Sequence, residues 1–292
     1  MSRRTFPAVL IAAAITLTAC GGGDSPGSDV PVADKPSFAA GSTMAKLADA
    51  GKLRVGTKFD QPGFGLKGLS GKPEGFDVEV ATIIAGALGI KAADIEYVES
   101  PSKVREELIE QGKVDLVAAT YTINDKRKER ISFAGPYYVA GQQLMVASDN
   151  STIKGPDDLK AAPDTKVCSV TGSTPAEQIQ EYLASPGQLV LFDVYDKCAD
   201  ALRTGQVGVV TTDNVILLGF VSKSQGKFKL VGEQFTEEPY GIGVTKGDTA
   251  FCEFINETLK KNEAAYTKAW EDTAGKVEGA KTPTLPPAAA CS

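Results

Sequence analysis

Stretches with strand character and stretches with helical character alternate along most of this 292-residue chain, and this alternation restricts its fold more than any other feature. Strands that alternate with helices favour α/β layers built on mainly parallel sheets. No repeat of the solenoid type is visible. The expected strands cover residues 53–57, 95–98, 114–119, 143–147, 167–170, 189–192, 207–212, 228–231 and 240–245.

Capping residues mark the expected helices. Asp77 and Ser102 can cap two of them, and Pro175 stands at the first position of a third. Glycines stand at the ends of the first two. The expected helices cover residues 78–88, 103–111, 125–130, 251–261 and 264–273, with another from Pro175 toward Ala184 and more between the later strands. The tail after Gly275 contains three prolines and is expected to be irregular.

The N-terminus has the pattern of a lipoprotein signal peptide. Arg3 and Arg4 precede an apolar run, Pro7–Leu17, which is too short to span a bilayer and fits the h-region of a signal peptide. The next residues, Leu17-Thr18-Ala19-Cys20, resemble a lipobox. The alternative is an ordinary signal peptide with an incidental cysteine. We expect residues 1–19 to be removed and Cys20 to carry a lipid that holds the protein at the extracellular face of the cytoplasmic membrane.

A segment with almost no bulky apolar residue follows. It is rich in Gly, Ser, Pro and Asp between Gly21 and about Pro36, so we expect residues 20–40 to form a flexible tether. About 240 residues remain, enough for two modest domains or one large domain.

Charge and composition exclude several function classes. The formal net charge is −6 and becomes about −8 without the first two arginines, which argues against a nucleic-acid partner. The chain has no histidine, so a Ser-His-Asp triad, a Cys-His pair and a histidine-containing metal site are all excluded. Enzymes that use carboxylates or lysines stay possible. No Cys-x-x-Cys spacing occurs, and we expect neither a metal nor a cofactor.

Four cysteines besides Cys20 would meet an oxidising compartment. Three pairings are possible, and we favour Cys168–Cys198 with Cys252–Cys291. The first pair joins an expected strand to an expected helix of one αβ stretch, and the second joins the extreme C-terminus to a helix. Each bond should stabilise the fold by about 3–4 kcal/mol.

Six motifs occur in the order known from one family. They are 53–57 (LRVGT), 75–81 (GFDVEVA), 112–116 (GKVDL), 122–127 (TINDKR), 133–138 (FAGPYY) and 168–176 (CSVTGSTPA). The chain from Leu53 to about Trp270 therefore resembles extracellular solute-binding protein family 3, the polar amino-acid-binding proteins. Segments 57–63 (TKFDQPG), 168–176 and 211–213 (TTD) look closer still to the glutamate-binding lipoproteins of actinobacterial uptake systems. The Cys252–Cys291 pair is not part of the family pattern.

The resemblance implies a two-lobed periplasmic-binding-protein-like fold of type II, with two sheets flanked by helices and joined by a two-strand hinge. Lobe 1 would cover residues 41–142 and 240–292, and lobe 2 residues 143–239. The family binds its ligand between the lobes, which close on it by a hinge motion. The implied partners are an amino acid, an ABC permease and its ATPase, and the protein would act as a monomer.

A free amino acid needs charged partners for its α-carboxylate and its α-ammonium when both leave water. By resemblance, Arg127 grips the carboxylate together with Thr120 and Thr122, and Asp213 receives the ammonium. On composition alone, Arg127 would belong to a solvated basic helix face. Asp213 has an alternative role as the cap of the next helix.

Six further residues are candidates for the site. Ser173 and Thr174 precede a helix whose N-terminus suits an anion, although plain capping explains them equally well. Ser102 begins the helix that carries Arg105. Gln61, Phe64 and Tyr195 can line the pocket, with ordinary packing as the alternative.

Lys58 and Arg105 bear on the side chain of the ligand. By resemblance, glutamate and aspartate binders place basic residues at these two positions. Two cations in one pocket repel each other unless an anion lies between them. Glutamate is therefore the expected ligand, with aspartate, glutamine and asparagine as alternatives. The competing interpretation leaves both cations exposed to solvent.

Two other functions compete with capture and delivery. Some relatives of this fold are cyclohexadienyl-type dehydratases, but the motifs place no carboxylate in the cleft beyond Asp213. An amino-acid sensor for a membrane signalling partner is the second. We expect a binding protein and not an enzyme.

Overall fold

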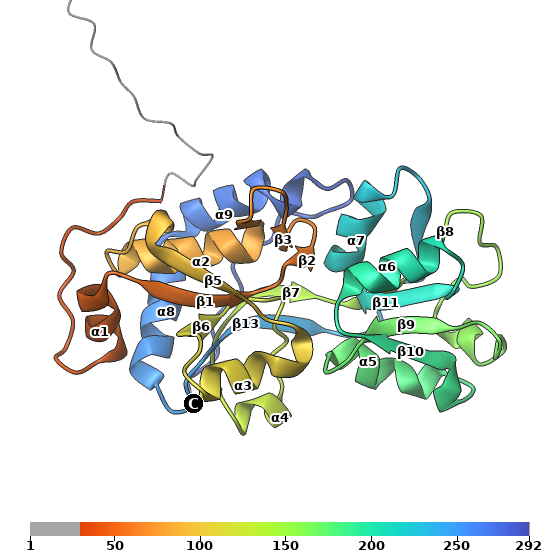
Figure 1. The fold of residues 1–292 in the computed structure, drawn as a ribbon, viewed down its shortest axis with the longest axis horizontal. Helices are drawn as coiled ribbons and strands as arrows, with labels where there is room; N and C mark the ends of the chain where they lie inside the picture. The colour runs from red at the N-terminus through yellow and green to blue at the C-terminus, as the bar shows by residue number, and fades with distance from the viewer. Residues whose placement is uncertain (1–29, 292) are drawn as a thin grey trace, which may run out of the picture.

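The computed structural model describes residues 30–291, which form two lobes side by side (Figure 1). Each lobe contains a five-stranded sheet with helices packed against it. The predicted signal peptide and the lipid site at Cys20 lie outside the described residues. Among the helices of residues 30–291, none is long and apolar enough to cross a membrane.

The first lobe is built from both ends of the described chain. Its sheet has the order β5-β1-β6-β13-β7. The strands are β1 (Leu53–Thr57), β5 (Ile95–Glu99), β6 (Leu116–Val117), β7 (Ser132–Ala140) and β13 (Glu238–Val244). The helices are α1 (Thr43–Ala50), α2 (Phe76–Ala87), α3 (Arg105–Glu110), α4 (Asp125–Lys128), α8 (Thr249–Lys261) and α9 (Glu263–Asp272), with 3-10 turns at Ala92–Asp94, Ser102–Val104 and Ala274–Lys276.

A second, three-stranded sheet in this lobe was not predicted. It consists of β2 (Asp60–Gln61), β3 (Gly65–Lys67) and β4 (Pro73–Glu74). Strands of two or three residues are too short to show an alternating pattern, so the sequence carries no signal for them.

The second lobe has a sheet in the order β10-β9-β11-β8-β12. Its strands are β8 (Gln142–Ala147), β9 (Val167–Val170), β10 (Leu189–Phe192), β11 (Val209–Asp213) and β12 (Phe228–Val231). Its helices are α5 (Thr174–Gln178), α6 (Tyr195–Arg203) and α7 (Asn214–Lys223), with 3-10 turns at Pro156–Leu159, Ile179–Tyr182 and Pro186–Gln188.

Both sheets are mixed, which corrects the expectation of mainly parallel sheets. In the first sheet β1 is parallel to β5 and β6, whereas β13 is antiparallel to β6 and β7. In the second, β9 is parallel to β10 and β11, whereas β8 is antiparallel to β11 and β12. The chain crosses out of the first lobe after β7 and returns into β13. A returning strand beside the outgoing one must run the opposite way, and Glu238 accordingly pairs with Ala140.

Helix α2 begins earlier than predicted. Its N-cap is Gly75, so the prediction that Asp77 caps the helix is wrong. Gly75 has a φ of 137°, and a Cβ there would lie 2.3 Å from the carbonyl oxygen of Phe64. Only glycine fits this position. Asp77 is instead buried within the first turn of the helix. Its carboxylate accepts hydrogen bonds from Thr120 and Tyr137.

Aromatic side chains fill the core of the first lobe. Phe64 contacts the rings of Phe76, Tyr138, Tyr240 and Trp270 with centroid distances near 6 Å. Phe64 therefore packs in the core and does not line the pocket. The expected alternative of ordinary packing is correct for this residue.

Two disulfides join the favoured pairs of cysteines. Cys168 on β9 is bonded to Cys198 on α6, with Cα atoms 5.6 Å apart, inside the core of the second lobe. Cys252 on α8 is bonded to Cys291, with Cα atoms 5.9 Å apart. The second bond holds the C-terminal tail against the first lobe.

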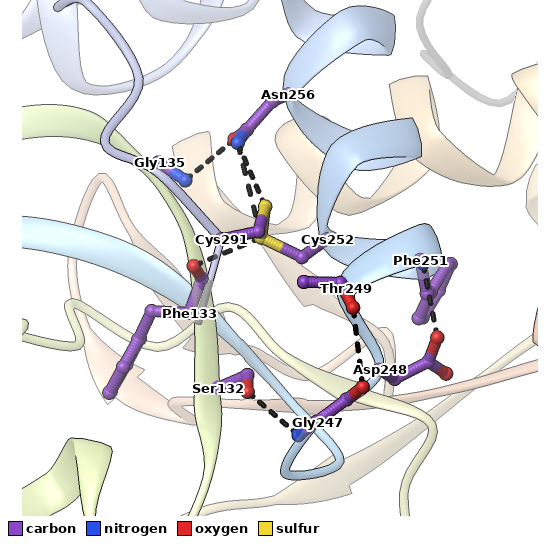
Figure 2. The surroundings of a disulfide bond; sticks show 10 residues. All are labelled: Ser132, Phe133, Gly135, Gly247, Asp248, Thr249, Phe251, Cys252, Asn256 and Cys291. Atoms are coloured by element: carbon purple, nitrogen blue, oxygen red, sulfur yellow. Dashed lines mark hydrogen bonds between the residues drawn. A yellow bond between two sulfur atoms is a disulfide. The ribbon is translucent and has the colours of Figure 1, made fainter.

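Polar contacts surround the Cys252–Cys291 bond (Figure 2). The Asn256 amide nitrogen lies 3.4 Å from the sulfur of Cys291, and its oxygen accepts from the N–H of Gly135 at 2.7 Å. The N–H of Ala289 donates to the carbonyl of Gly135 at 2.7 Å. The tail is irregular beyond its 3-10 turn, yet it is bonded to the lobe by both covalent and polar contacts.

Residues 30–40, which the sequence assigned to the tether, lie along the first lobe. The N–H of Ala33 donates to the carbonyl of Gly86 on α2 at 2.9 Å. The ring of Phe38 meets that of Phe254 on α8 edge-on at 5.5 Å.

Candidate functional site

A small cavity lies between the two lobes, and eight of the eleven predicted ligand-binding residues line it. From the first lobe these are Ser102, Arg105, Thr120 and Thr122, and from the second Ser173, Thr174, Tyr195 and Asp213. Pro175, Thr212 and Ile216 line it too and were not predicted. The remaining three, Lys58, Gln61 and Arg127, do not line the cavity, but each forms a hydrogen bond with a residue that does.

Thr120 has an unusual backbone at the cavity wall. Its φ is 45°, a left-handed conformation that β-branched residues rarely adopt. Its N–H donates to Asp77 at 2.8 Å, and its hydroxyl donates to the side chain of Gln61 at 3.0 Å. These contacts stabilise Thr120 in a strained backbone conformation. Strained conformations of this kind cluster at functional sites.

The buried carboxylate of Asp77 helps to fix the position of Thr120 in the cavity wall. Besides the N–H of Thr120, its carboxylate accepts the hydroxyl of Tyr137 at 2.5 Å. Burial raises the pKa of Asp77 to about 7, while these two hydrogen bonds act in the opposite direction. Sequence reasoning missed both Asp77 and Tyr137 as site residues, although both lie in the family motifs.

Arg105 is buried with part of its guanidinium unsatisfied. Its Nη1 donates to the carbonyls of Ala119 at 2.9 Å and Thr120 at 3.3 Å. The guanidinium lies 4.0 Å from the ring centroid of Tyr121, a cation–π contact. Its Nε is buried without a hydrogen-bond partner. Burial, followed by repulsion from Arg127, lowers the pKa of Arg105 to about 10.

Arg127 is held from several sides. Its Nη1 donates to the carbonyl of Thr122 at 2.6 Å, and its Nη2 donates across the cleft to the carbonyl of Gly172 at 3.1 Å. Its Nε lies 3.3 Å from Glu106, and its guanidinium lies 5.1 Å from the ring centroid of Tyr121. One aromatic ring thus lies against both buried guanidinium groups.

Lys58 is nearly fully buried and donates to the hydroxyl of Ser102 at 2.8 Å. Ser102 begins a 3-10 turn and makes no capping hydrogen bond, so its predicted role as a helix cap is wrong. A buried ammonium needs an acceptor, and the Ser102 hydroxyl supplies one. Burial, followed by repulsion from Arg105, lowers the pKa of Lys58 to about 7.

Asp213 is the buried carboxylate on the opposite wall. It occupies the N-cap position of α7 but makes no capping hydrogen bond, so the capping alternative is wrong for its side chain. Its Oδ2 accepts the hydroxyl of Tyr240 from the first lobe at 2.6 Å, whereas its Oδ1 has no hydrogen-bond partner. Burial, followed by the neighbouring charge of Glu238, raises the pKa of Asp213 to about 7.

Ser173 and Thr174 have different local roles. The Ser173 hydroxyl caps α5 by accepting from the N–H of Ala176 at 3.1 Å. The hydroxyls of Thr174 and of Thr122 both donate to Glu238, each at 2.7 Å. Since their hydrogens point to Glu238, these two hydroxyls can accept from a ligand but not donate to it.

The lobes meet closely around the cavity. The N–H of Tyr195 donates to Asp60 across the cleft at 2.7 Å, and Lys126 forms an ion pair with Glu177 at 3.1 Å. The closed cleft therefore has cations on the first-lobe wall and a partly unsatisfied carboxylate on the other. Such an arrangement suits a small molecule that bears both charges. No group of His, Cys, Asp or Glu side chains in residues 30–291 is arranged to hold a metal ion.

Known proteins match this chain over most of its length. Residues 53–270 match the model of bacterial extracellular solute-binding proteins, family 3. Glutamate-binding protein GluB of Corynebacterium efficiens is 40% identical over 271 residues, which cover 89% of this chain and 85% of that protein. The glutamine-binding protein GlnH of Bacillus subtilis is 36% identical over 262 residues, 89% of this chain and 92% of that protein.

Solved structures agree with the sequence matches. An ancestral arginine-binding protein bound to arginine superimposes with a TM-score of 0.70 at 36% identity, covering 76% of this chain and 98% of that one. The predicted two-lobed α/β fold of type II is thereby confirmed. Motifs, fold and matched length lead to one conclusion: the chain belongs to the bacterial extracellular solute-binding proteins of family 3.

Proposed function

We propose that this protein captures L-glutamate between its lobes and delivers it to an ABC importer, while a lipid on Cys20 keeps it at the extracellular face of the cytoplasmic membrane. Its family and the names of its relatives, which include glutamate- and glutamine-binding proteins, support an amino-acid ligand. The named relatives are binding proteins rather than enzymes.

One observation carries the proposal: two buried charged groups on facing walls each keep an unsatisfied atom. Arg105 Nε lacks a partner in the first lobe, and Asp213 Oδ1 lacks one in the second. Both side chains line the same cavity. A buried polar atom without a partner costs about 1–3 kcal/mol, and more when the group is charged. A ligand with an anionic and a cationic end relieves both costs at once.

The number of buried cations favours glutamate over a neutral amino acid. The hydroxyls of Thr120 and Thr122 already donate to Gln61 and Glu238 in this structure, so the α-carboxylate is assigned to the Arg127 guanidinium and the α-ammonium to Asp213. Arg105 and Lys58 are then left for the side chain. Burial, followed by repulsion from Arg105, lowers the pKa of Lys58. A second carboxylate between them removes that repulsion, whereas an amide does not.

A thermal-shift panel of the twenty amino acids tests the ligand. A ligand that binds only the folded state raises the melting temperature by mass action. We expect the largest shift with L-glutamate and none with D-glutamate. A largest shift with an aliphatic or basic amino acid would contradict the proposal, and turnover of prephenate or arogenate would favour a dehydratase.

Anchoring and delivery are tested in cells. We expect Cys20→Ser to move the protein from the membrane fraction to the medium. Glutamate uptake should depend on a permease and an ATPase whose genes lie near that of this chain. Retention of the Cys20→Ser protein in the membrane fraction would contradict the lipid anchor.

A further inference from the structure

Glu238 is a fully buried carboxylate at the hinge that sequence reasoning did not single out. It is the first residue of β13, the strand by which the chain returns to the first lobe, and it pairs with Ala140 at the end of the outgoing strand β7. Its backbone therefore belongs to the part of the molecule about which the lobes would turn.

The Glu238 side chain bonds to both lobes. Its Oε2 accepts the hydroxyl of Thr122 from the first lobe and that of Thr174 from the second, both at 2.7 Å. The two hydroxyl oxygens lie 3.3 Å apart. Its Oε1 accepts the hydroxyl of Thr236, two residues away in the chain, at 3.0 Å. A single carboxylate oxygen thus connects two residues that line the cavity from opposite sides.

This carboxylate is compensated by hydroxyls rather than by a cation. Among residues 30–291, no lysine or arginine lies within ion-pair distance of Glu238. A buried carboxylate without a counter-ion depends on the hydrogen bonds that it accepts. If the lobes separate, Thr174 moves away with the second lobe and Glu238 loses one of three donors. The closed arrangement is the one in which Glu238 is satisfied entirely by protein groups.

We propose that Glu238 is a positioning residue of the binding site: it holds the Thr122 and Thr174 hydroxyls together across the cleft and so stabilises the closed, ligand-holding state. The ligand in the test below rests on the proposed function. The bridging role itself rests on the contacts of Glu238 alone.

Calorimetry with L-glutamate on the full chain and its variants tests this role. We expect Glu238→Ala to weaken binding at least tenfold through faster dissociation, measured by stopped flow. Glu238→Gln should stay within about threefold of wild type, because the amide oxygen can accept both hydroxyls. Thr236→Val is the matched control, since its hydroxyl contacts the other carboxylate oxygen and does not cross the cleft, and it should also stay within about threefold. Circular dichroism and thermal unfolding confirm that each variant is folded.

A double-mutant cycle separates positioning from general support of the hinge. If Glu238 acts through Thr174, then Glu238→Ala combined with Thr174→Val should bind no more than about twofold more weakly than the worse single variant. Losses that multiply across the two sites would overturn the proposal, as would a Glu238→Gln protein as weak as Glu238→Ala.

Failure of the proposed ligand can be told apart from failure of this inference. If wild type prefers another amino acid in the thermal-shift panel, the same cycle is run with that amino acid. If wild type binds none, small-angle scattering replaces calorimetry. The Glu238→Ala protein should then have the larger radius of gyration, and identical scattering curves would overturn the bridging role.

Discussion

Arg127 differs in burial from the basic residues around it, and the sequence does not show this difference. Lys126, Lys128 and Arg130 are exposed or half-exposed, whereas Arg127 is buried. The solvated-face interpretation is thus correct for its neighbours and wrong for Arg127. Only the position of Arg127 within the motif 122–127 distinguished it, because all four residues carry a positive charge and lie in the same short segment.

We therefore expect Arg127→Ala to abolish measurable glutamate binding while the fold persists. Truncating one partner of a buried charge pair costs about 2–5 kcal/mol or more, which corresponds to a loss in affinity of about thirtyfold to several thousandfold. Calorimetry measures the loss. Arg130→Ala is the matched control, since Arg130 pairs with Glu110 at the surface, and it should bind as wild type does. Near wild-type affinity in a folded Arg127→Ala protein would exclude the assigned role.

A bell-shaped pH dependence of glutamate affinity is expected from Asp213 and Lys58. Burial raises the pKa of Asp213 to about 7, so the carboxylate that we propose as the partner of the ligand's ammonium becomes charged as pH rises from 5 to 7, and affinity should increase. The pKa of Lys58 is lowered to about 7, so its positive charge is lost above that pH, and affinity for an anionic side chain falls. Each limb should approach tenfold per pH unit.

The two limbs can be separated with one variant and calorimetry at pH 5 to 9. Lys58→Met should lose the alkaline limb and keep the acid limb. A persistent alkaline limb in Lys58→Met would show that another group titrates there. Besides Tyr240, which bonds to it, Asp213 is influenced by the charges of Glu238, Arg105 and Arg127, so Glu238→Gln should shift the acid limb toward lower pH.

Most strands of the two five-stranded sheets were predictable from the sequence, and the strand with an interrupted pattern was not. Strand β1 begins and ends as predicted, and so do β9, β10 and β12. The prediction missed β7, because Gly135 and Pro136 lie inside it and normally argue against a strand. It missed α1 as well. The combination of parallel and antiparallel pairing could not be predicted from the sequence either. It follows from how the chain crosses between the lobes and not from the local residue pattern.

The disulfide between α8 and the tail should contribute stability but not affinity. It closes a loop of 39 residues, and the chain-entropy model gives about 3–4 kcal/mol for its loss. We expect Cys252→Ala with Cys291→Ala to lower the free energy of urea unfolding by about that amount. The same variant should bind glutamate normally, because neither cysteine lines the interlobe cavity. A change in affinity of more than about threefold would show that the tail communicates with the cleft.

Two glycines at the interface between the lobes allow the lobes to approach each other closely. A Cβ on Gly219 of α7 would lie 2.4 Å from the carbonyl oxygen of Pro62 in the first lobe. A Cβ on Gly172 would lie 2.7 Å from the Cα of Lys103. The sequence marked Gly172 through its motif but gave no sign of Gly219, because contacts between lobes depend on how they close.

Gly219→Ala should prevent full closure without weakening its own lobe. Alanine in a helix is favoured over glycine by about 1 kcal/mol, so α7 itself is expected to gain stability. We expect affinity for glutamate to fall at least tenfold and small-angle scattering to show a less compact liganded state. Gly187→Ala, whose nearest neighbouring atom would be 4.0 Å away, is the control. Unchanged affinity in Gly219→Ala would contradict the closed arrangement as the ligand-holding state.

We propose that two buried cations, Lys58 and Arg105, recognise the anionic side chain of the ligand. Hydrogen bonds to charged groups contribute about 1.5–3 kcal/mol, against about 0.5–1.5 for neutral ones, which amounts to roughly tenfold or more in affinity. The most direct measurement is the ratio of the calorimetric dissociation constants for L-glutamine and L-glutamate. We predict a ratio of at least about ten for wild type, and a ratio near or below one for Lys58→Met combined with Arg105→Met. Equal affinities in wild type, or a glutamate preference that survives in the double variant, would show that Lys58 and Arg105 do not recognise the side chain of the ligand.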